Sequence, residues 1–321
     1  MLSVLMEETL DYDTFVSTVQ LIMKERMGDG YDVRIYKVMK NNSLELHSLV
    51  VRKEDINIAP NIYLKPYYDA YLEGVSLEEI ADRLCIIYNS YSEPELNQDF
   101  SYVLEEMKSY IFYRLVSFEK NQKLLETVPY FRYLDLAVTF HCLVRDDEEG
   151  IGTIRITNEH MRLWEVTPEK LKDLAVQNTE KLFPPSIKSM EEVLLGILKD
   201  TAPGEAEEMK QLLSLESDPQ GKEVRQVRPM MYILTNRKGI NGASCLLYKD
   251  VIRNFARQLN ADLYLLPSSI HEIILVPRDR NMKVEALSKM VEEVNRTQVA
   301  EEEVLSDHVY YYSLEKDTIF I

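Results

Sequence analysis

The chain has 321 residues, enough for one large domain or two ordinary ones, each with its own core. Hydrophobic residues make up 45% of it, which separates it from disordered acidic segments. With 37 lysines and arginines against 54 aspartates and glutamates, the formal net charge is -17, and a charge of that sign repels phosphate backbones and anionic lipid headgroups. Nucleic-acid binding is therefore disfavoured, although a local basic patch would escape this argument.

The sequence predicts a cytoplasmic protein without a membrane segment. No apolar run approaches the roughly 20 residues that span a bilayer. The apolar start, Met1–Met6, is short and runs directly into two glutamates, unlike the basic leader of a secretory signal. Whether Met1 or Met6 is the natural start stays open. An odd number of widely separated cysteines in apolar stretches favours reduced, buried thiols; they are Cys85, Cys142 and Cys245.

The first part of the chain predicts a mixture of helices and a hairpin. Apolar residues recur at helical spacing after Asp11 and Asp13, either of which can cap a helix. Ser76 and Glu79 form a capping-box pattern at the start of another helix. We expect a helix over residues 12–27, a hairpin over 33–52, a short strand over 58–64, and helices over 65–72 and from 77 onward.

The middle of the chain changes character. Leu134–Val144 is almost continuously apolar, which predicts a strand buried on both faces and paired in a hairpin over 134–157. Thr167 followed by Pro168 is typical of a helix start, and Ser189 is a natural cap. We expect a helical region over 99–125, then helices over 158–164, 168–182 and 190–198.

The remainder predicts a linker and a second set of strands and helices. Residues 201–229 are rich in charge, proline and glycine, although 205–215 have helical character. We expect strands over 230–235, 243–247, 262–267, 271–277 and 309–312, and helices over 250–259 and 283–295. Hairpins mixed with helices indicate an α+β fold with mixed, mainly antiparallel sheets packed by amphipathic helices. The predicted domains are an N-terminal α+β region over 1–200, a linker over 201–229 and a C-terminal α+β domain over 230–321.

Several stretches resemble an uncharacterised bacterial family, domain of unknown function 5688, over nearly the whole chain. They are Tyr130–Leu136, Ile156–His160 with Trp164, Tyr232–Asn236 with Ile240–Ala243, and Ala261–Pro277. The middle and C-terminal stretches are also distantly similar to domain of unknown function 1444. The resemblance implies a cytoplasmic bacterial protein with one coherent architecture. It implies no activity and no catalytic residue.

The polar cluster between two predicted strands supplies candidate catalytic residues. Ser268, Ser269 and His271, with His160 from a distant turn, are the residue types of a hydrolase. Neighbours in a tight turn face opposite ways, however, and a Gly-x-Ser-x-Gly elbow is absent. A hairpin connection whose hydroxyls satisfy backbone amides is the favoured interpretation.

Ligand-binding candidates come from two other segments. Asn158 follows a predicted strand and suits a helix cap, while Trp164 suits either a core anchor or a stacking platform for a ligand. The second segment is a loop rich in glycine and positive charge, whose backbone amides and cations suit an anion. An ordinary turn is the favoured alternative, because a P-loop ending is absent. Its candidate residues are Asn236, Arg237, Lys238 and Asn241.

Other chemistry is not indicated. His141 and Cys142 are adjacent strand residues and point to opposite faces, so they cannot act as a pair. The histidines and cysteines show no metal-ligand spacing, and no cofactor is expected. The tyrosines near residues 63–71 favour core packing, with a groove for a protein partner as the alternative.

Two functional hypotheses follow. The preferred one is a non-catalytic binding or regulatory module that recognises a protein or a small ligand. The alternative is a hydrolase-type enzyme of unrecognised class, which uses the Ser268, Ser269 and His271 turn together with His160.

Overall fold

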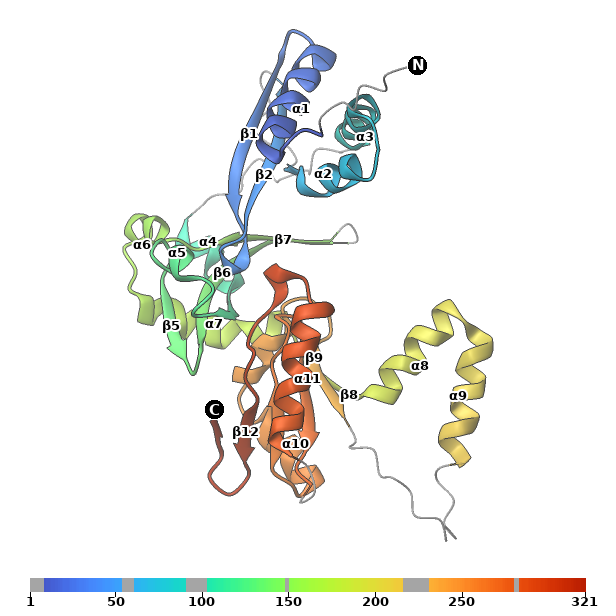
Figure 1. The fold of residues 1–321 in the computed structure, drawn as a ribbon. Helices are drawn as coiled ribbons and strands as arrows, with labels where there is room; N and C mark the ends of the chain where they lie inside the picture. Colours follow the sequence, from blue (N-terminus) through green and yellow to red (C-terminus); the bar gives the residue numbers. More distant parts are fainter. Residues whose placement is uncertain (1–8, 54–60, 91–102, 148–149, 216–230, 280–282) are drawn as a thin grey trace. The chain divides into compact units, whose positions relative to one another are not determined.

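The computed structural model describes residues 9–53, 61–90, 103–147, 150–215, 231–279 and 283–321 (Figure 1). The chain divides into two compact units, 1–101 and 102–321, and each is described by itself. The three sheets of the described residues are all antiparallel, and helices pack against them. The α+β prediction is confirmed.

The first unit contains the predicted helix and hairpin. Asp11 accepts a hydrogen bond of 2.8 Å from the backbone N–H of Thr14 and caps the first helix, which ends at Gly28 with a positive φ of 72°. The hairpin pairs from Tyr31 opposite Lys53 to Met39 opposite Glu45, and β3 confirms two residues of the predicted strand, whose residues 58–60 lie outside the described part. The elements are α1 (Tyr12–Met27), β1 (Tyr31–Met39), η1 (Asn41–Ser43), β2 (Glu45–Lys53), β3 (Ile62–Tyr63), α2 (Lys65–Leu72) and α3 (Leu77–Ser90).

The core of this unit uses the tyrosines of α2. Phe15 is fully buried, and the rings of Tyr68 and Tyr71 lie 5.2 and 5.5 Å from its ring. The hydroxyl of Tyr68 donates to the carbonyl of Leu10 at 3.1 Å, and the N–H of Leu10 donates to the Tyr71 hydroxyl at 3.1 Å. These tyrosines therefore pack in the core, as the favoured interpretation predicted.

The second unit begins with a four-stranded sheet in which β4, β6 and β5 are neighbours and β7 pairs with β6. The helical region predicted for 99–125 is wrong, because its centre is a strand. The sequence Ile111–Ser117 is buried on both faces, and periodicity alone cannot distinguish such a strand from a buried helix. Only short helical turns flank it. The elements are α4 (Leu104–Met107), η2 (Lys108–Tyr110), β4 (Ile111–Ser117), α5 (Gln122–Leu125), β5 (Tyr130–Tyr133), β6 (Leu136–Asp147) and β7 (Gly150–Arg155).

The second sheet of this unit has six strands in the order β13, β12, β10, β11, β9, β8. The strand predicted for 243–247 is wrong, because Gly242–Leu247 forms a 3-10 helix packed on β9. Its small residues allow this close approach. The elements are α6 (Asn158–Trp164), α7 (Pro168–Leu182), β8 (Pro185–Ser189), α8 (Met190–Thr201), α9 (Pro203–Leu215), β9 (Tyr232–Asn236), η3 (Gly242–Leu247), α10 (Val251–Leu259), β10 (Leu263–Leu266), β11 (Ile273–Pro277), α11 (Val284–Thr297), η4 (Glu301–Glu303), β12 (Tyr310–Ser313) and β13 (Thr318–Phe320).

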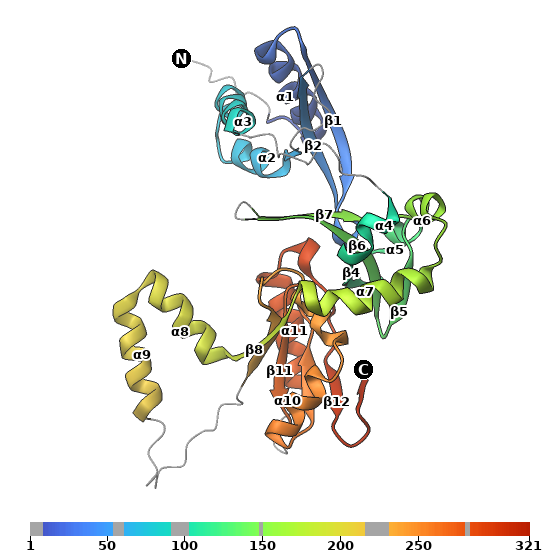
Figure 2. The same ribbon diagram turned by 180° about the vertical axis from the view of Figure 1, so that it is seen from behind.

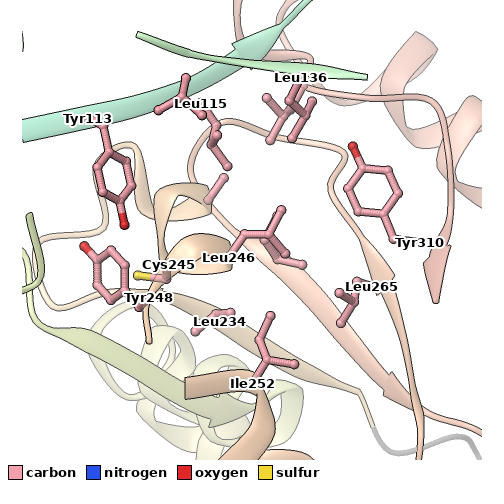
Figure 3. Packing of buried hydrophobic residues seen from close by; sticks show 14 of the residues in the cluster. Tyr113, Leu115, Leu136, Leu234, Cys245, Leu246, Tyr248, Ile252, Leu265 and Tyr310 are labelled. Carbon is pink, nitrogen blue, oxygen red and sulfur yellow. The ribbon is translucent and has the colours of Figure 1, made fainter. Parts of the chain in front are cut away.

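The main core of the second unit lies between its two sheets. Leu115 and Leu136 from the first sheet meet Leu234 and Leu265 from the second, and η3 contributes Leu246 between them (Figure 3). The opposite face of the six-stranded sheet packs against α11, as the reversed view shows (Figure 2). The two sheets therefore share one core, with η3 placed between them.

The strand β8 joins residues before the predicted linker to the six-stranded sheet, because Pro185 lies opposite Asn236. The helical part of the linker is α9, and residues 216–229 lie outside the described part. The domain boundaries at 200 and 229 stay a prediction. Among the described residues, no helix combines the length and the apolar character needed to cross a membrane.

Candidate functional site

A pocket lies in the second unit, beside the edge strand β4, and it opens to solvent; the space in and at the mouth of the pocket is about 260 Å³. The free space at its centre is close to that of one water molecule. It is therefore sized for a small group and not for a large ligand. Its lining comes from β4, from β7, from the end of α7 and from the segment that runs from the end of β9 through η3: Phe112, Tyr113, Arg114, Ile151, Thr179, Phe183, Asn236, Ile240, Asn241, Ser244 and Tyr248.

The wall from β9 to η3 depends on a glycine. A Cβ added to Gly242 would lie 2.1 Å from the hydroxyl of Thr235, 2.4 Å from the carbonyl oxygen of His271 and 2.8 Å from the backbone nitrogen of Asn236. No side chain fits in that space, so Gly242 lets η3 approach β9 and the turn that precedes β11. This approach places Ser244 in the pocket wall.

The amide of Asn236 organises the loop that follows β9. Its Nδ2 donates to the carbonyl of Ile240 at 2.8 Å, and its Oδ1 accepts from the N–H of Lys238 at 2.9 Å. The side chain is buried, and both of its polar atoms are used within the loop. Asn236 therefore shapes the wall, and its amide already has partners there.

Among the described residues, two polar atoms of the pocket lining are buried without a hydrogen-bond partner. They are Nε of Arg114, from β4, and Oγ of Ser244, from η3. Both atoms carry a proton to donate. Buried donors are nearly always paired in folded proteins, so this pocket offers hydrogen bonds that the described chain does not accept.

Apart from Arg114, the residues that line the pocket are uncharged, and several are aromatic. Tyr113 and Tyr248 point toward each other next to the sulfur of Cys245 (Figure 3). Burial raises the pKa of both phenols well above the usual value, and burial raises the pKa of the Cys245 thiol to about 12. The Tyr248 hydroxyl donates to the carbonyl of Phe183 at 2.8 Å. These groups stay protonated at neutral pH and contribute shape and neutral polarity.

In the loop predicted to bind an anion, residues 236–241, the two positive charges do not point to a shared anion site. Lys238 forms an ion pair with Asp146, and Arg237 is exposed. Asn241 has a positive φ of 52° and opens η3, which matches the turn alternative. The loop therefore contributes backbone and amide groups to the pocket. Among the described residues that line the pocket, the cation without an acidic partner is Arg114, which belongs to β4.

In the predicted catalytic turn, the side chains of Ser269 and His271 form hydrogen bonds with the backbone. Ser269 Oγ accepts from the backbone N–H of His271 at 3.0 Å. The His271 ring accepts from the N–H of Asn241 at 3.3 Å through Nδ1 and lies 3.3 Å from a carboxylate oxygen of Glu303 through Nε2. Ser268 is buried, and within the described residues neither serine hydroxyl bonds to the imidazole. The hydroxyl of Ser269 therefore contacts the backbone of His271 and not its ring.

The helix that carries His160 is capped one residue earlier than predicted. Thr157, not Asn158, is the cap, and His160 Nδ1 accepts from the N–H of Thr157 at 3.0 Å. The Nδ2 of Asn158 donates to the carbonyl of Glu126 at 3.1 Å. The rings of His160 and Trp164 stack with centroids 5.5 Å apart. The contacts of His160 are thus within its own helix turn and do not include the His271 turn.

Sequence reasoning missed Arg114 and Ser244, the two residues with unpaired donors. Arg114 is the one charged residue of Ile111–Ser117, an apolar segment for which the sequence predicts a helix, and the sequence predicts a strand for the segment that contains Ser244. A charged residue inside an apolar run was the available signal, because such residues are seldom buried without a partner. In the described residues no cluster of histidine, cysteine and acidic side chains suits a metal ion.

The fold and the pocket define an α+β protein with a small polar pocket between two antiparallel sheets. The chain belongs to the Family of unknown function (DUF5688), whose model matches residues 12–314. No curated protein and no solved structure matches the chain. The expected family membership is confirmed, and it supplies no activity.

Proposed function

We propose that this chain is a non-catalytic, cytoplasmic module that binds a small ligand in the pocket beside β4. The observation that carries the proposal is the pair of buried donors, Arg114 Nε and Ser244 Oγ, which belong to two residues that line the same pocket. Leaving a buried donor unpaired costs about 1–3 kcal/mol. A ligand with acceptor atoms would remove that cost and gain binding energy from it.

The neutral groups around the pocket support binding in preference to catalysis. An activated nucleophile needs a lowered pKa or an adjacent base. Burial instead raises the pKa of the Cys245 thiol and of the Tyr113 and Tyr248 phenols. Groups held in their protonated forms can shape a ligand site, but they are poor nucleophiles at neutral pH.

The test uses the full chain labelled with ¹⁵N and a fixed set of small probes: acetate, acetamide, imidazole, glycerol and inorganic phosphate. We expect at least one probe to shift the backbone amide signals of Ile151, Asn241 and Ser244 saturably. Ser244→Val, which fills the pocket and removes the hydroxyl, should abolish the shifts. Ser268→Ala, at a buried serine that does not line the pocket, should leave them unchanged.

Two outcomes would contradict the proposal. One is that none of the five probes moves these amides at concentrations up to 100-fold above the protein. The other is that the shifts persist unchanged in Ser244→Val.

A further inference from the structure

Three basic side chains share one face of the four-stranded sheet. Where β4 pairs with β6, Arg114 lies opposite Thr139, and Phe112 lies opposite His141. Where β6 pairs with β7, His141 lies opposite Arg155. Directly opposed residues of antiparallel strands share a face, as do residues two apart on one strand. Arg114, His141 and Arg155 therefore lie on the same side of the sheet.

The contacts of these residues connect the basic face to the pocket. One guanidinium nitrogen of Arg114 donates to the hydroxyl of Thr153 at 3.0 Å, and the guanidinium lies 5.2 Å from the ring of Phe112. The ring of His141 lies 5.7 Å from the same phenylalanine. Arg114 and Phe112 both line the pocket, so this face extends from the pocket across the sheet.

In the part of the chain that the structure describes, none of the three basic groups has an acidic partner. Within the described residues, no carboxylate oxygen lies within 4.0 Å of Arg114, His141 or Arg155. The chain as a whole has 54 acidic residues against 37 lysines and arginines, so counter-charges are abundant elsewhere. The surroundings of Arg114 are instead the hydroxyl of Thr153, the ring of Phe112 and the positive charge of Arg155.

Burial and mutual repulsion disfavour the charged forms of these three basic side chains. Burial, followed by repulsion from Arg155, lowers the pKa of Arg114 to about 10, and burial lowers the pKa of Arg155. Burial, with repulsion from both arginines, lowers the pKa of His141 well below its usual value. The arginines still carry their charge at neutral pH, so an uncompensated positive potential remains at the pocket.

We propose that the pocket, with the basic face beside it, receives one oxygen of a small oxyanion, the phosphate or carboxylate group of a ligand. Guanidinium groups form paired, charge-assisted hydrogen bonds with these oxyanions. Arg114 Nε supplies an unpaired donor, Ser244 Oγ supplies a second, and Arg155 supplies further positive charge. This inference rests on the proposed function, because it names the ligand chemistry for the same pocket.

The test measures binding of sodium phosphate and of sodium acetate to the full chain by isothermal titration calorimetry. Sodium chloride keeps the ionic strength constant, and acetamide serves as the neutral analogue of acetate. We expect saturable one-to-one binding of phosphate or acetate and at least tenfold weaker binding of acetamide. The two anions distinguish a phosphate site from a carboxylate site. Because the net charge is -17, non-specific attraction of anions is not expected.

Variants connect the binding to the proposed residues. Arg114→Met keeps much of the length of the side chain and removes the charge, and it should weaken anion binding tenfold or more. Arg132→Met removes an exposed arginine of the same sheet and should leave the binding unchanged. If Arg114→Met does not fold, Arg155→Met provides the same comparison and should weaken binding severalfold.

The outcomes separate this inference from the proposed function. Acetamide binding without phosphate or acetate binding would overturn the oxyanion while leaving the ligand pocket standing. Absence of binding by every probe would overturn both. Anion binding that is unchanged in Arg114→Met and in Arg155→Met would overturn the assignment to this face.

Discussion

Replacing Gly242 with alanine tests the packing that forms the pocket wall. The added Cβ would lie 2.1 Å from Thr235 Oγ1, 2.4 Å from the carbonyl oxygen of His271 and 2.8 Å from the backbone nitrogen of Asn236. Favourable carbon contacts begin near 3.5 Å, so η3 would have to move by about 1 Å from β9 and from the turn before β11. Two of the three atoms belong to the backbone and cannot rotate away.

The magnitude follows from the cost of overpacking. Extra methyl groups in packed cores cost about 1–3 kcal/mol and occasionally more, and the backbone contacts place Gly242→Ala at or above the upper value, about 3 kcal/mol. For a unit of this size, each kcal/mol lowers the melting temperature by about 2–4 °C, so we expect a fall of roughly 6–12 °C. Circular dichroism during heating, together with urea unfolding, measures both quantities.

Gly196 supplies the matched control. It lies within α8, and an added Cβ there would have no atom within 4 Å. Gly196→Ala should therefore stabilise the chain by about 0.5–1 kcal/mol, since alanine favours helices over glycine. If Gly242→Ala were as stable as the unmodified chain, the close approach of η3 to β9 and β11 would be refuted.

Three further predictions concern protonation, thiols and the two units. The buried His141 stays neutral in the folded chain, whereas in the unfolded chain it takes up a proton as the pH falls. The free energy of unfolding should therefore fall by about 1.4 kcal/mol per pH unit below pH ~6.5, down to the pKa of His141 in the folded chain. In urea unfolding, the free energy of unfolding of His141→Gln should fall less steeply with pH by that amount, and equal slopes for the two proteins would contradict the prediction. Burial raises the pKa of the Cys142 and Cys245 thiols to about 12. A disulfide reagent at pH 8 should therefore modify Cys85 alone in the native chain and all three cysteines in urea. Rapid modification of a second thiol in the native chain would contradict this prediction. Residues 102–321 produced alone should fold cooperatively and keep the amide spectrum of the pocket, whereas an unfolded fragment would show that this unit is not independent.

Much of the fold was predictable from local signals. Asp11 and Ser189 cap helices as expected, because a capping side chain bonds to a backbone only three residues away. The strand β4 was not predictable in the same way, since a segment buried on both faces has no alternation. The 3-10 helix η3 depends on the fit of Gly242 against β9 and against the turn before β11, and that information is absent from the segment itself.

The candidate site was less predictable than the fold. The loop after β9 was identified, yet its lysine is neutralised by Asp146, a residue from the other sheet. The pocket forms only when β4, the end of α7 and η3 meet, and these lie far apart in the sequence. The charge of Arg114 inside an apolar run was visible, but its lack of a partner becomes apparent only in three dimensions.

The most direct test of the central claim is the Nε–H signal of Arg114 in a ¹⁵N spectrum of the full chain, assigned by its loss in Arg114→Met. We predict that this signal shifts saturably when sodium phosphate or sodium acetate replaces sodium chloride at constant ionic strength, because the unpaired donor gains an oxyanion acceptor. A signal that stays in place at saturating concentrations of both anions would contradict the oxyanion site.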